Sequence, residues 1–141
     1  MSGLLSELDF QRQLVGTKPP GLAVIYGWEH VHFRPAMTKH GYRTAGSGSM
    51  AAGWPDLVLV RPRDRRLIFA ELKRDGAELS PDQRHVLDLL GALRQTGVEA
   101  SCGNHKSTAE ALAYRCSECP LFVQVVVWHP SDWAAIERVL R

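Results

Sequence analysis

The chain has 141 residues, of which 45% are hydrophobic and 23% are charged. This composition excludes an intrinsically disordered protein, and the length fits one domain over residues 1–141 with a single active site. Seventeen lysines and arginines against fifteen acidic residues give a formal net charge of +2, which excludes a protein that coats nucleic acid through bulk positive charge.

No part of the sequence looks like a membrane or secretion signal. No apolar run reaches the roughly 20 residues that cross a bilayer, and no basic stretch with an apolar core begins the chain. The three cysteines are an odd number, and Cys116 and Cys119 lie too close together to indicate a disulfide framework. We therefore expect a soluble, cytoplasmic protein without a membrane partner.

The first predicted element is a helix over residues 4–15, which the Pro19-Pro20 pair prevents from continuing. Its apolar side chains recur at helical spacing: Leu4, Leu8, Phe10, Leu14 and Val15. At about 100° per residue, Glu7 lies in the middle of this apolar arc. A carboxylate that faces a core is costly unless it is paired or bound to a metal, so this position favours an active-site role. The alternative is a first-turn acid that suits the helix dipole.

Residues 28–33 predict a short strand, and the polar, glycine-rich stretch 38–53 predicts a loop. Candidate contacts to a DNA backbone lie around this loop, and they are Arg34, Lys39 and Arg43, with Tyr42 available for stacking. A solvated loop is the alternative. Three histidines precede the next strands, and such residues are more often packed or solvated than catalytic; they are His30, His32 and His40.

Two apolar runs, residues 57–60 and 67–70, flank a charged turn that contains a proline, which predicts a β-hairpin. The four arginines of the turn are expected to form a charged surface; they are Arg61, Arg63, Arg65 and Arg66. Asp56 and Glu71 are equidistant from the midpoint of the turn, so a symmetric register places them opposite each other. Opposed like charges destabilise a sheet unless something compensates, and a divalent cation with carboxylate ligands would do so.

Lys73 lies two residues after Glu71 and therefore on the same face of the strand. A metal site with an adjacent ammonium group is suited to phosphodiester hydrolysis, because the metal activates water and the ammonium stabilises developing negative charge. The alternative is a turn aspartate followed by an edge strand with solvated charges.

The second half of the chain predicts a helix, a strand and a helix. Ser80-Pro81-Asp82-Gln83 combines an N-cap serine, proline at the first helical position and a capping-box glutamine, and the helix is expected to end near Gly97. Its predicted buried residues are Val86, Leu89, Leu90 and Leu93. Residues 122–128 predict a strand buried on both faces, and residues 133–140 a helix capped by Ser131 or Asp132. The predicted fold is α/β, in the order α, β, ββ, α, β, α.

Three segments together resemble the VRR-NUC branch of the PD-(D/E)XK nucleases, and they read GWPDLVLV from residue 53, LIFAELK from residue 67 and LSPDQ from residue 79. The likeness extends to Glu7 with Phe10-Gln11, to Gly27-Trp28 and His32-Phe33-Arg34, and to residues 127–133. It implies a restriction-endonuclease-like core, a mixed β-sheet flanked by helices, and Mg²⁺- or Mn²⁺-dependent nuclease activity.

The resemblance also implies roles for single residues. Asp56, Glu71 and Lys73 would be the catalytic set, and the backbone carbonyl of Leu72 a further metal ligand beside Asp56, Glu71 and Glu7. Gln83 matches a family position near the site, although the capping box explains it equally well. Stand-alone members are similar to phage-borne nucleases and to Holliday-junction resolvases, which implies a homodimer that acts on branched or flapped DNA. A non-catalytic nucleic-acid-binding module is the alternative.

Residues 98–121 depart from the family pattern as an insertion that holds every cysteine. Two ligand pairs with two-residue spacing lie in it, Cys102 with His105 and Cys116 with Cys119. This donor set suits a structural Zn²⁺, whose binding would stabilise an insertion with little core of its own. The alternatives are cysteines that serve only in packing, and an adaptor protein in which a zinc-stabilised insertion is the functional part.

Overall fold

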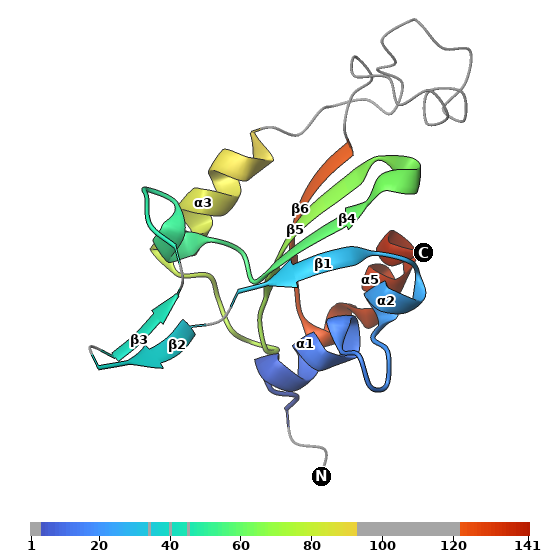
Figure 1. The fold of residues 1–141 in the computed structure, drawn as a ribbon, viewed down its shortest axis with the longest axis horizontal. Helices are drawn as coiled ribbons and strands as arrows, with labels where there is room; N and C mark the ends of the chain where they lie inside the picture. Colours follow the sequence, from blue (N-terminus) through green and yellow to red (C-terminus); the bar gives the residue numbers. More distant parts are fainter. Residues whose placement is uncertain (1–3, 34, 40, 45, 93–121) are drawn as a thin grey trace, which may run out of the picture.

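The computed structural model describes residues 4–33, 35–39, 41–44, 46–92 and 122–141. Before α3 the chain forms two helices and three strands of a four-stranded sheet. They are α1 (Glu7–Val15), α2 (Leu22–Ile25), β1 (Glu29–His32), β4 (Leu57–Arg61) and β5 (Arg66–Leu72). The remaining segments are β2 (Pro35–Thr38), β3 (Gly41–Thr44), α3 (Pro81–Gly91), β6 (Phe122–Trp128) and α5 (Trp133–Leu140), with short 3-10 turns η1 (Ala51–Gly53), η2 (Pro62–Asp64) and η3 (Pro130–Asp132). Figure 1 shows the arrangement.

The main sheet has the order β1-β4-β5-β6. β4 pairs antiparallel with β1 and β5, whereas β5 and β6 run parallel, so the sheet is mixed. The fold class is therefore as predicted, an α/β fold with a mixed sheet flanked by helices that agrees with a restriction-endonuclease-like core. None of the described helices is long and apolar enough to span a membrane.

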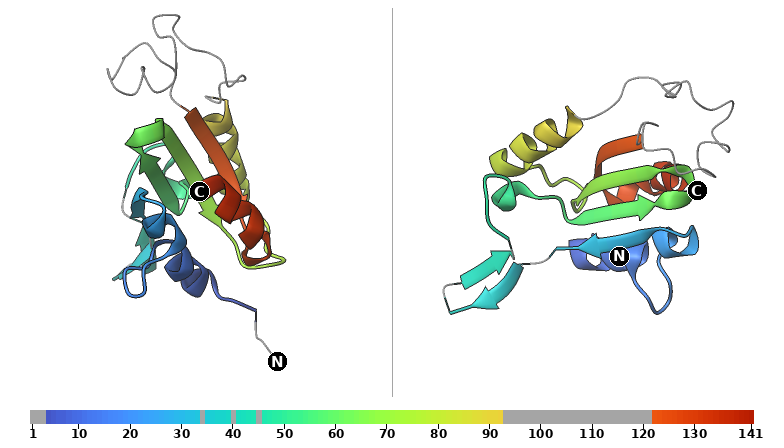
Figure 2. Two further views of the ribbon diagram at one scale, coloured as in Figure 1. Left: turned by 90° about the vertical axis from the view of Figure 1, so that its right-hand side faces the viewer. Right: turned by 45° about the horizontal axis from the view of Figure 1, so that its top comes forward.

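The core lies on one face of this sheet. Leu57 and Leu59 of β4 stand opposite Ala70 and Ile68 of β5, and all four are fully buried. They form one cluster with side chains from α1, α2 and α5, among them Phe10, Leu14, Ala23, Ile136 and Leu140. α3 lies on the opposite face, so the sheet separates α1 from α3 (Figure 2, left).

α1 begins later than predicted, because Ser6 is its N-cap and its hydroxyl accepts a hydrogen bond from the amide of Asp9 at 3.1 Å. Its first turn is exposed, including Glu7 and Leu8, and the first buried side chain is Phe10. The prediction that Glu7 faces the core is therefore wrong: the helical arc is right, but the core does not reach the first turn.

The predicted loop over residues 38–53 is wrong in part, because β3 lies within it and pairs antiparallel with β2, which ends at Thr38. In the register of these strands, Met37 is opposite Tyr42. Both figures show this hairpin projecting away from the main sheet. The glycine-rich, polar composition of this region indicated a loop. The two strands have only four residues each, which is too short to give a clear strand pattern in the sequence.

The elements of the second half keep their predicted order, with differences in detail. α3 ends at Gly91, short of Gly97, and buries Val86, Leu87 and Leu90, whereas Leu89 is 45% exposed. β6 has the predicted bounds but is half-buried along Val123 to Val127, because among the described strands it lies at the edge of the sheet. α2, with only four residues, was not predicted.

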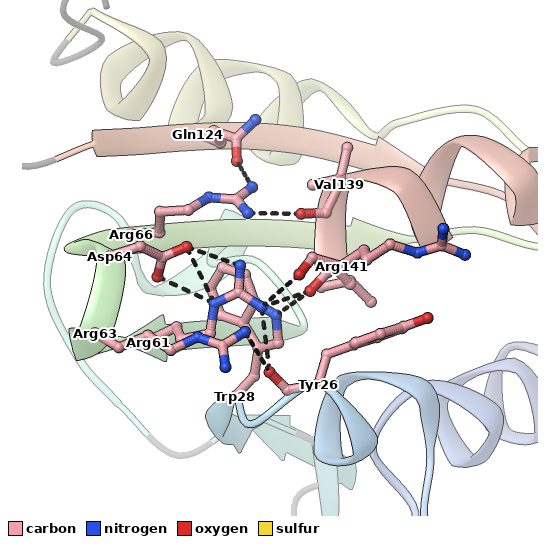
Figure 3. A network of polar contacts seen from close by, with 10 residues as sticks. Tyr26, Trp28, Arg61, Arg63, Asp64, Arg66, Gln124, Val139 and Arg141 are labelled. Carbon is pink, nitrogen blue, oxygen red and sulfur yellow. Dashed lines mark hydrogen bonds and ion pairs between the residues drawn. The ribbon is translucent and has the colours of Figure 1, made fainter.

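The charged turn of the β4–β5 hairpin is not a plain surface turn (Figure 3). Arg61 is only 3% exposed, and its guanidinium donates to the backbone carbonyls of Leu140 at 2.7 Å and Tyr26 at 3.2 Å. It also pairs with Asp64 at 2.8 Å. The prediction of a charged surface is therefore wrong for Arg61, which binds the end of α5 to the hairpin.

Arg66 and Trp28 complete this network. Arg66 donates to the carbonyl of Val139 at 2.7 Å, and the Trp28 indole donates to the carbonyl of Leu140 at 2.8 Å. The guanidinium carbons of Arg61 and Arg66 lie 4.5 and 5.0 Å from the centre of the Trp28 ring, within the range of cation–π attraction. Helix C-terminal carbonyls thus find donors and a favourable positive charge.

Candidate active site

The open end of the β4–β5 hairpin brings Asp56 and Glu71 together. The register runs from Arg61 opposite Arg66 to Leu57 opposite Ala70, so one more step places Asp56 opposite Glu71. The predicted symmetric register is confirmed. A carboxylate oxygen of Asp56 also accepts a hydrogen bond from the Leu72 amide at 2.8 Å, which fixes Asp56 beside the last residue of β5.

The two carboxyl groups oppose each other electrostatically. Glu71 is 1% exposed, and its pKa is raised to about 7, first by burial and then by the charge of Asp56. Burial likewise raises the pKa of Asp56, against the opposing effects of the Leu72 amide and Lys73. The site therefore resists carrying two negative charges unless a cation is added.

Two side chains bind the same oxygen of Glu71. The amide nitrogen of Gln83 donates to Oε1 at 2.6 Å, and the ammonium of Lys73 lies 3.2 Å from Oε1. Lys73 therefore lies beside Glu71, as the period of a strand predicted. The other carboxylate oxygen of Glu71, Oε2, is buried and has no hydrogen-bond partner among the described residues.

Gln83 uses both ends of its amide. Its oxygen accepts a hydrogen bond from the Ser80 amide at 2.9 Å, and the Ser80 hydroxyl accepts one from the Gln83 amide at 3.2 Å, which completes the predicted capping box. Its nitrogen is then free to bind Glu71. The two interpretations of Gln83 from the sequence are therefore both met by the geometry, and the cap holds the side chain toward the site.

The donor set suits a hard divalent cation. A buried carboxylate oxygen without a partner normally has an explanation, and an ion is one of them. The Lys73 amide donates to the Trp128 carbonyl at 3.0 Å, toward β6. In a trans peptide the preceding carbonyl, that of Leu72, points the opposite way, toward the side of Asp56. Two carboxylates and a carbonyl leave room for the water and phosphate oxygens that Mg²⁺ prefers.

Glu7 contributes to this site through its charge, which raises the pKa of Asp56. Among the described residues, no group of three or more His, Cys, Asp or Glu side chains is close enough to hold a metal ion. Glu7 therefore lies near Asp56 without forming a three-carboxylate group with Asp56 and Glu71.

The backbone at Gly53 lies so close to α3 that it leaves no room for a side chain. A Cβ atom at this position would lie 2.1 Å from the Asp82 carbonyl oxygen and 2.8 Å from a methyl of Val86, both on α3. Trp54 then packs edge-on against Phe33 and Phe69, with ring centres 6.4 and 5.7 Å apart. The close approach brings the segment that leads into Asp56 against the helix that carries Gln83.

The other predicted site residues are not brought into this cluster. His30 and His32 stack on each other on β1, with ring centres 6.3 Å apart. Lys39 is exposed at the turn of the projecting β2–β3 hairpin, Tyr42 and Arg43 lie on β3, and Arg34 and His40 fall outside the described residues. The proposed zinc ligands also lie outside them; these are Cys102, His105, Cys116 and Cys119.

Comparison with known proteins adds one match. Residues 34–102 match the model of the VRR-NUC domain, a range that contains Asp56, Glu71, Lys73 and Gln83. No curated protein and no solved structure matches the chain.

Proposed function

Because the chain belongs to the VRR-NUC domain family, whose members have a nuclease-type function, we propose that it is a divalent-metal-dependent DNA endonuclease that hydrolyses phosphodiester bonds. The observation that carries the metal dependence is the buried, unpartnered Oε2 of Glu71 opposite a second carboxylate. A buried carboxylate opposed to a half-buried one, without a cation, would be a costly arrangement for a fold to keep.

Asp56, Glu71 and the Leu72 carbonyl would hold the cation, Mg²⁺ or Mn²⁺. When bound, such an ion makes a water nucleophilic near neutral pH and withdraws charge from a phosphoryl group. Asp56 is held in place by the Leu72 amide, and Glu71 by Gln83 through Oε1, which leaves Oε2 available as a ligand. Glu7 adds negative charge near Asp56 and so favours cation binding.

Lys73 would act on the scissile phosphate. Its side chain is 12% exposed, and its ammonium lies next to Glu71 on the face that carries both carboxylates. An ammonium held at this place stabilises negative charge that develops on phosphate oxygens, or orients the attacking water. The neutralising contact with Glu71 keeps Lys73 in position before substrate arrives.

The substrate proposed is DNA, and the projecting β2–β3 hairpin is the element best placed to contact its backbone. Lys39 is exposed at its turn, and Tyr42 and Arg43 lie on β3. Arg34, which lies outside the described residues, precedes β2 in the sequence and is included in this proposal. Such contacts position a duplex without reading its sequence. We accordingly propose selectivity for branched or flapped DNA, a homodimer as the acting form, and a structural Zn²⁺ in the cysteine-bearing insertion.

The test is incubation with Mg²⁺, Mn²⁺ or a chelator and a panel of linear, flapped, forked and four-way DNA. We expect cleavage with either metal, none with the chelator, and none by Asp56→Asn. Asp88→Asn, an exposed aspartate on α3, is the matched control and keeps activity. Absence of cleavage on every substrate, or cleavage by Asp56→Asn at the rate of the control, would overturn the proposal.

A further inference from the structure

The segment from residue 73 to residue 80 connects the two partners of Glu71. Lys73 begins this 73–80 loop, and Ser80, which ends it, caps the helix that carries Gln83. Both Lys73 and Gln83 bind Oε1 of Glu71. The distance between β5 and the start of α3, which the loop sets, therefore decides whether both contacts form together.

Three hydrogen bonds tie this loop to the last residue of β6 and to the residues that follow β6. The Lys73 amide donates to the Trp128 carbonyl at 3.0 Å. The Ser131 amide donates to the Asp75 carboxylate at 3.1 Å, and Nε2 of His129 lies 3.4 Å from the Ala77 carbonyl oxygen. The loop is thus held at its start, in its middle and near its end by residues 128–131.

The His129 ring is itself held in orientation. The carboxylate of Asp132 accepts a hydrogen bond from the His129 amide at 2.9 Å and faces Nδ1 of the same ring at 3.3 Å. Because Asp132 occupies the side of Nδ1, the ring presents Nε2 to Ala77. The Ala77 carbonyl oxygen can only accept, so a hydrogen bond at this place requires the form of the ring in which Nε2 carries a proton.

We propose that His129 and Asp75 are positioning residues of the nuclease site, which hold the 73–80 loop so that Lys73 and Gln83 meet Glu71; this rests on the proposed function. The sequence alone assigned no role to His129, and these contacts supply one. Displacements of about 1 Å in a catalytic group can lower rates by roughly a hundredfold, so a loose loop would be costly.

The experiment compares His129→Ala and Asp75→Ala with conservative variants in the full chain. Each alanine variant should lower kcat by roughly tenfold to a hundredfold, the usual effect of removing a residue that holds a metal ligand in place. The Kd for DNA should be nearly unchanged. Gln at 129 keeps an N–H donor and Asn at 75 keeps an acceptor oxygen, so His129→Gln and Asp75→Asn should recover most of the rate. Glu78→Ala is the control, since the Glu78 side chain is exposed in the same loop and forms no hydrogen bond or ion pair with the described residues.

Two further readouts separate positioning from a loss of folding. In a double-mutant cycle, His129→Ala should cost much less in a Gln83→Ala background, because residues that act through one another are not additive. Amide hydrogen exchange should become faster in the 73–80 loop and the first turn of α3 for His129→Ala, and not for Glu78→Ala.

The outcomes are distinct. Wild-type kcat in both alanine variants, fully multiplicative losses in the cycle, or unchanged exchange in the loop would overturn the positioning role. Hydrogen exchange needs no cleavage, so it tests the contacts even if wild-type protein proves inactive, and inactivity of wild-type protein would count against the proposed function alone.

Discussion

The two ends of the β4–β5 hairpin differ in how far their charged side chains are matched by partners of opposite charge or by backbone groups. At the turn, Arg61 and Arg66 are matched by Asp64 and by backbone carbonyls of Tyr26 and the chain end. At the open end, Asp56 opposes Glu71, and one buried oxygen of Glu71 has no hydrogen-bond partner in the part of the chain that the structure describes. The turn therefore stabilises the fold, whereas the open end stores repulsion that binding of a cation would relieve.

The comparison separates stability from activity within a single pair of strands. Functional sites often keep arrangements that cost stability, and relief of them stabilises the protein at the expense of activity. Substitutions at the open end should therefore remove activity and spare or raise stability. Substitutions at the turn should lower stability and leave activity nearly unchanged.

The largest effect is expected from Glu71→Gln at the open end. The amide keeps an oxygen for Gln83 but removes the charge that would bind a cation, so the cleavage rate should fall by roughly a thousandfold or more. Because the repulsion with Asp56 also disappears, the free energy of unfolding should rise by about 1 kcal/mol. Cleavage assays and chemical denaturation measure the two changes, and a clear loss of stability would contradict the comparison.

Arg61→Met tests the turn. Methionine keeps much of the length but leaves Asp64 and the carbonyls of α5 without their donor, which should lower the free energy of unfolding by about 3 kcal/mol. Below the melting temperature, kcat should stay within a few-fold of wild type. The matched control is Arg63→Met, an exposed arginine of the same turn, with an expected change of under about 0.5 kcal/mol. Equal losses in both variants would show that the buried network adds no stability.

Gly53→Ala is expected to lower both stability and activity, because Gly53 lies where the open end meets α3. Its Cβ would collide with the Asp82 carbonyl, so α3 must move, at a cost of about 1–3 kcal/mol. The same movement should carry Gln83 away from Glu71 and lower kcat. Thermal melting and cleavage assays on Gly53→Ala and on Gly91→Ala, a site open to a Cβ, make the test. An unchanged kcat in a destabilised Gly53→Ala variant would contradict the expectation that one movement of α3 lowers both stability and activity.

The smallest effect is a dependence of stability on pH at the turn. Partial burial acts to raise the pKa of Asp64, but the hydrogen bond and charge of Arg61 outweigh it and lower the pKa below 3.8. A carboxylate with a lowered folded-state pKa adds stability above its ordinary value, which is lost as the pH falls through the folded value.

Asp64→Asn should therefore cost at most about 1 kcal/mol at neutral pH, since Asp64 is a third exposed. The difference in Tm from wild type should shrink in acid, below 3.8. Melting curves at both pH values measure it, with Asp88→Asn as the control. A difference that grows on acidification would reverse the assigned sign.

Much of the open end could be predicted from the sequence, because its determinants are local. Counting from the turn gave the opposition of Asp56 and Glu71, strand period gave Lys73, and the capping motif gave the start of α3. The turn could not be predicted in this way. Arg61 is buried by carbonyls that lie up to 80 residues further along the chain, and no local pattern encodes those partners.

The errors on Glu7 and on the β2–β3 hairpin also arise because local sequence patterns do not encode contacts between distant parts of the chain. The helical arc of α1 was correct, but the extent of the core decides which turn is buried, and that extent is set by the sheet. The contacts of His129 with Ala77 join residues 52 positions apart and were likewise invisible.

The most direct test of a cation site at the open end is a Mn²⁺ titration followed by electron paramagnetic resonance. Wild type and Asp64→Asn should bind Mn²⁺ with the same affinity, and Asp56→Asn and Glu71→Gln should bind it at least roughly tenfold more weakly. Equal affinity of all four proteins, or loss in Asp64→Asn alone, would contradict the assignment of the open end to metal and the turn to stability.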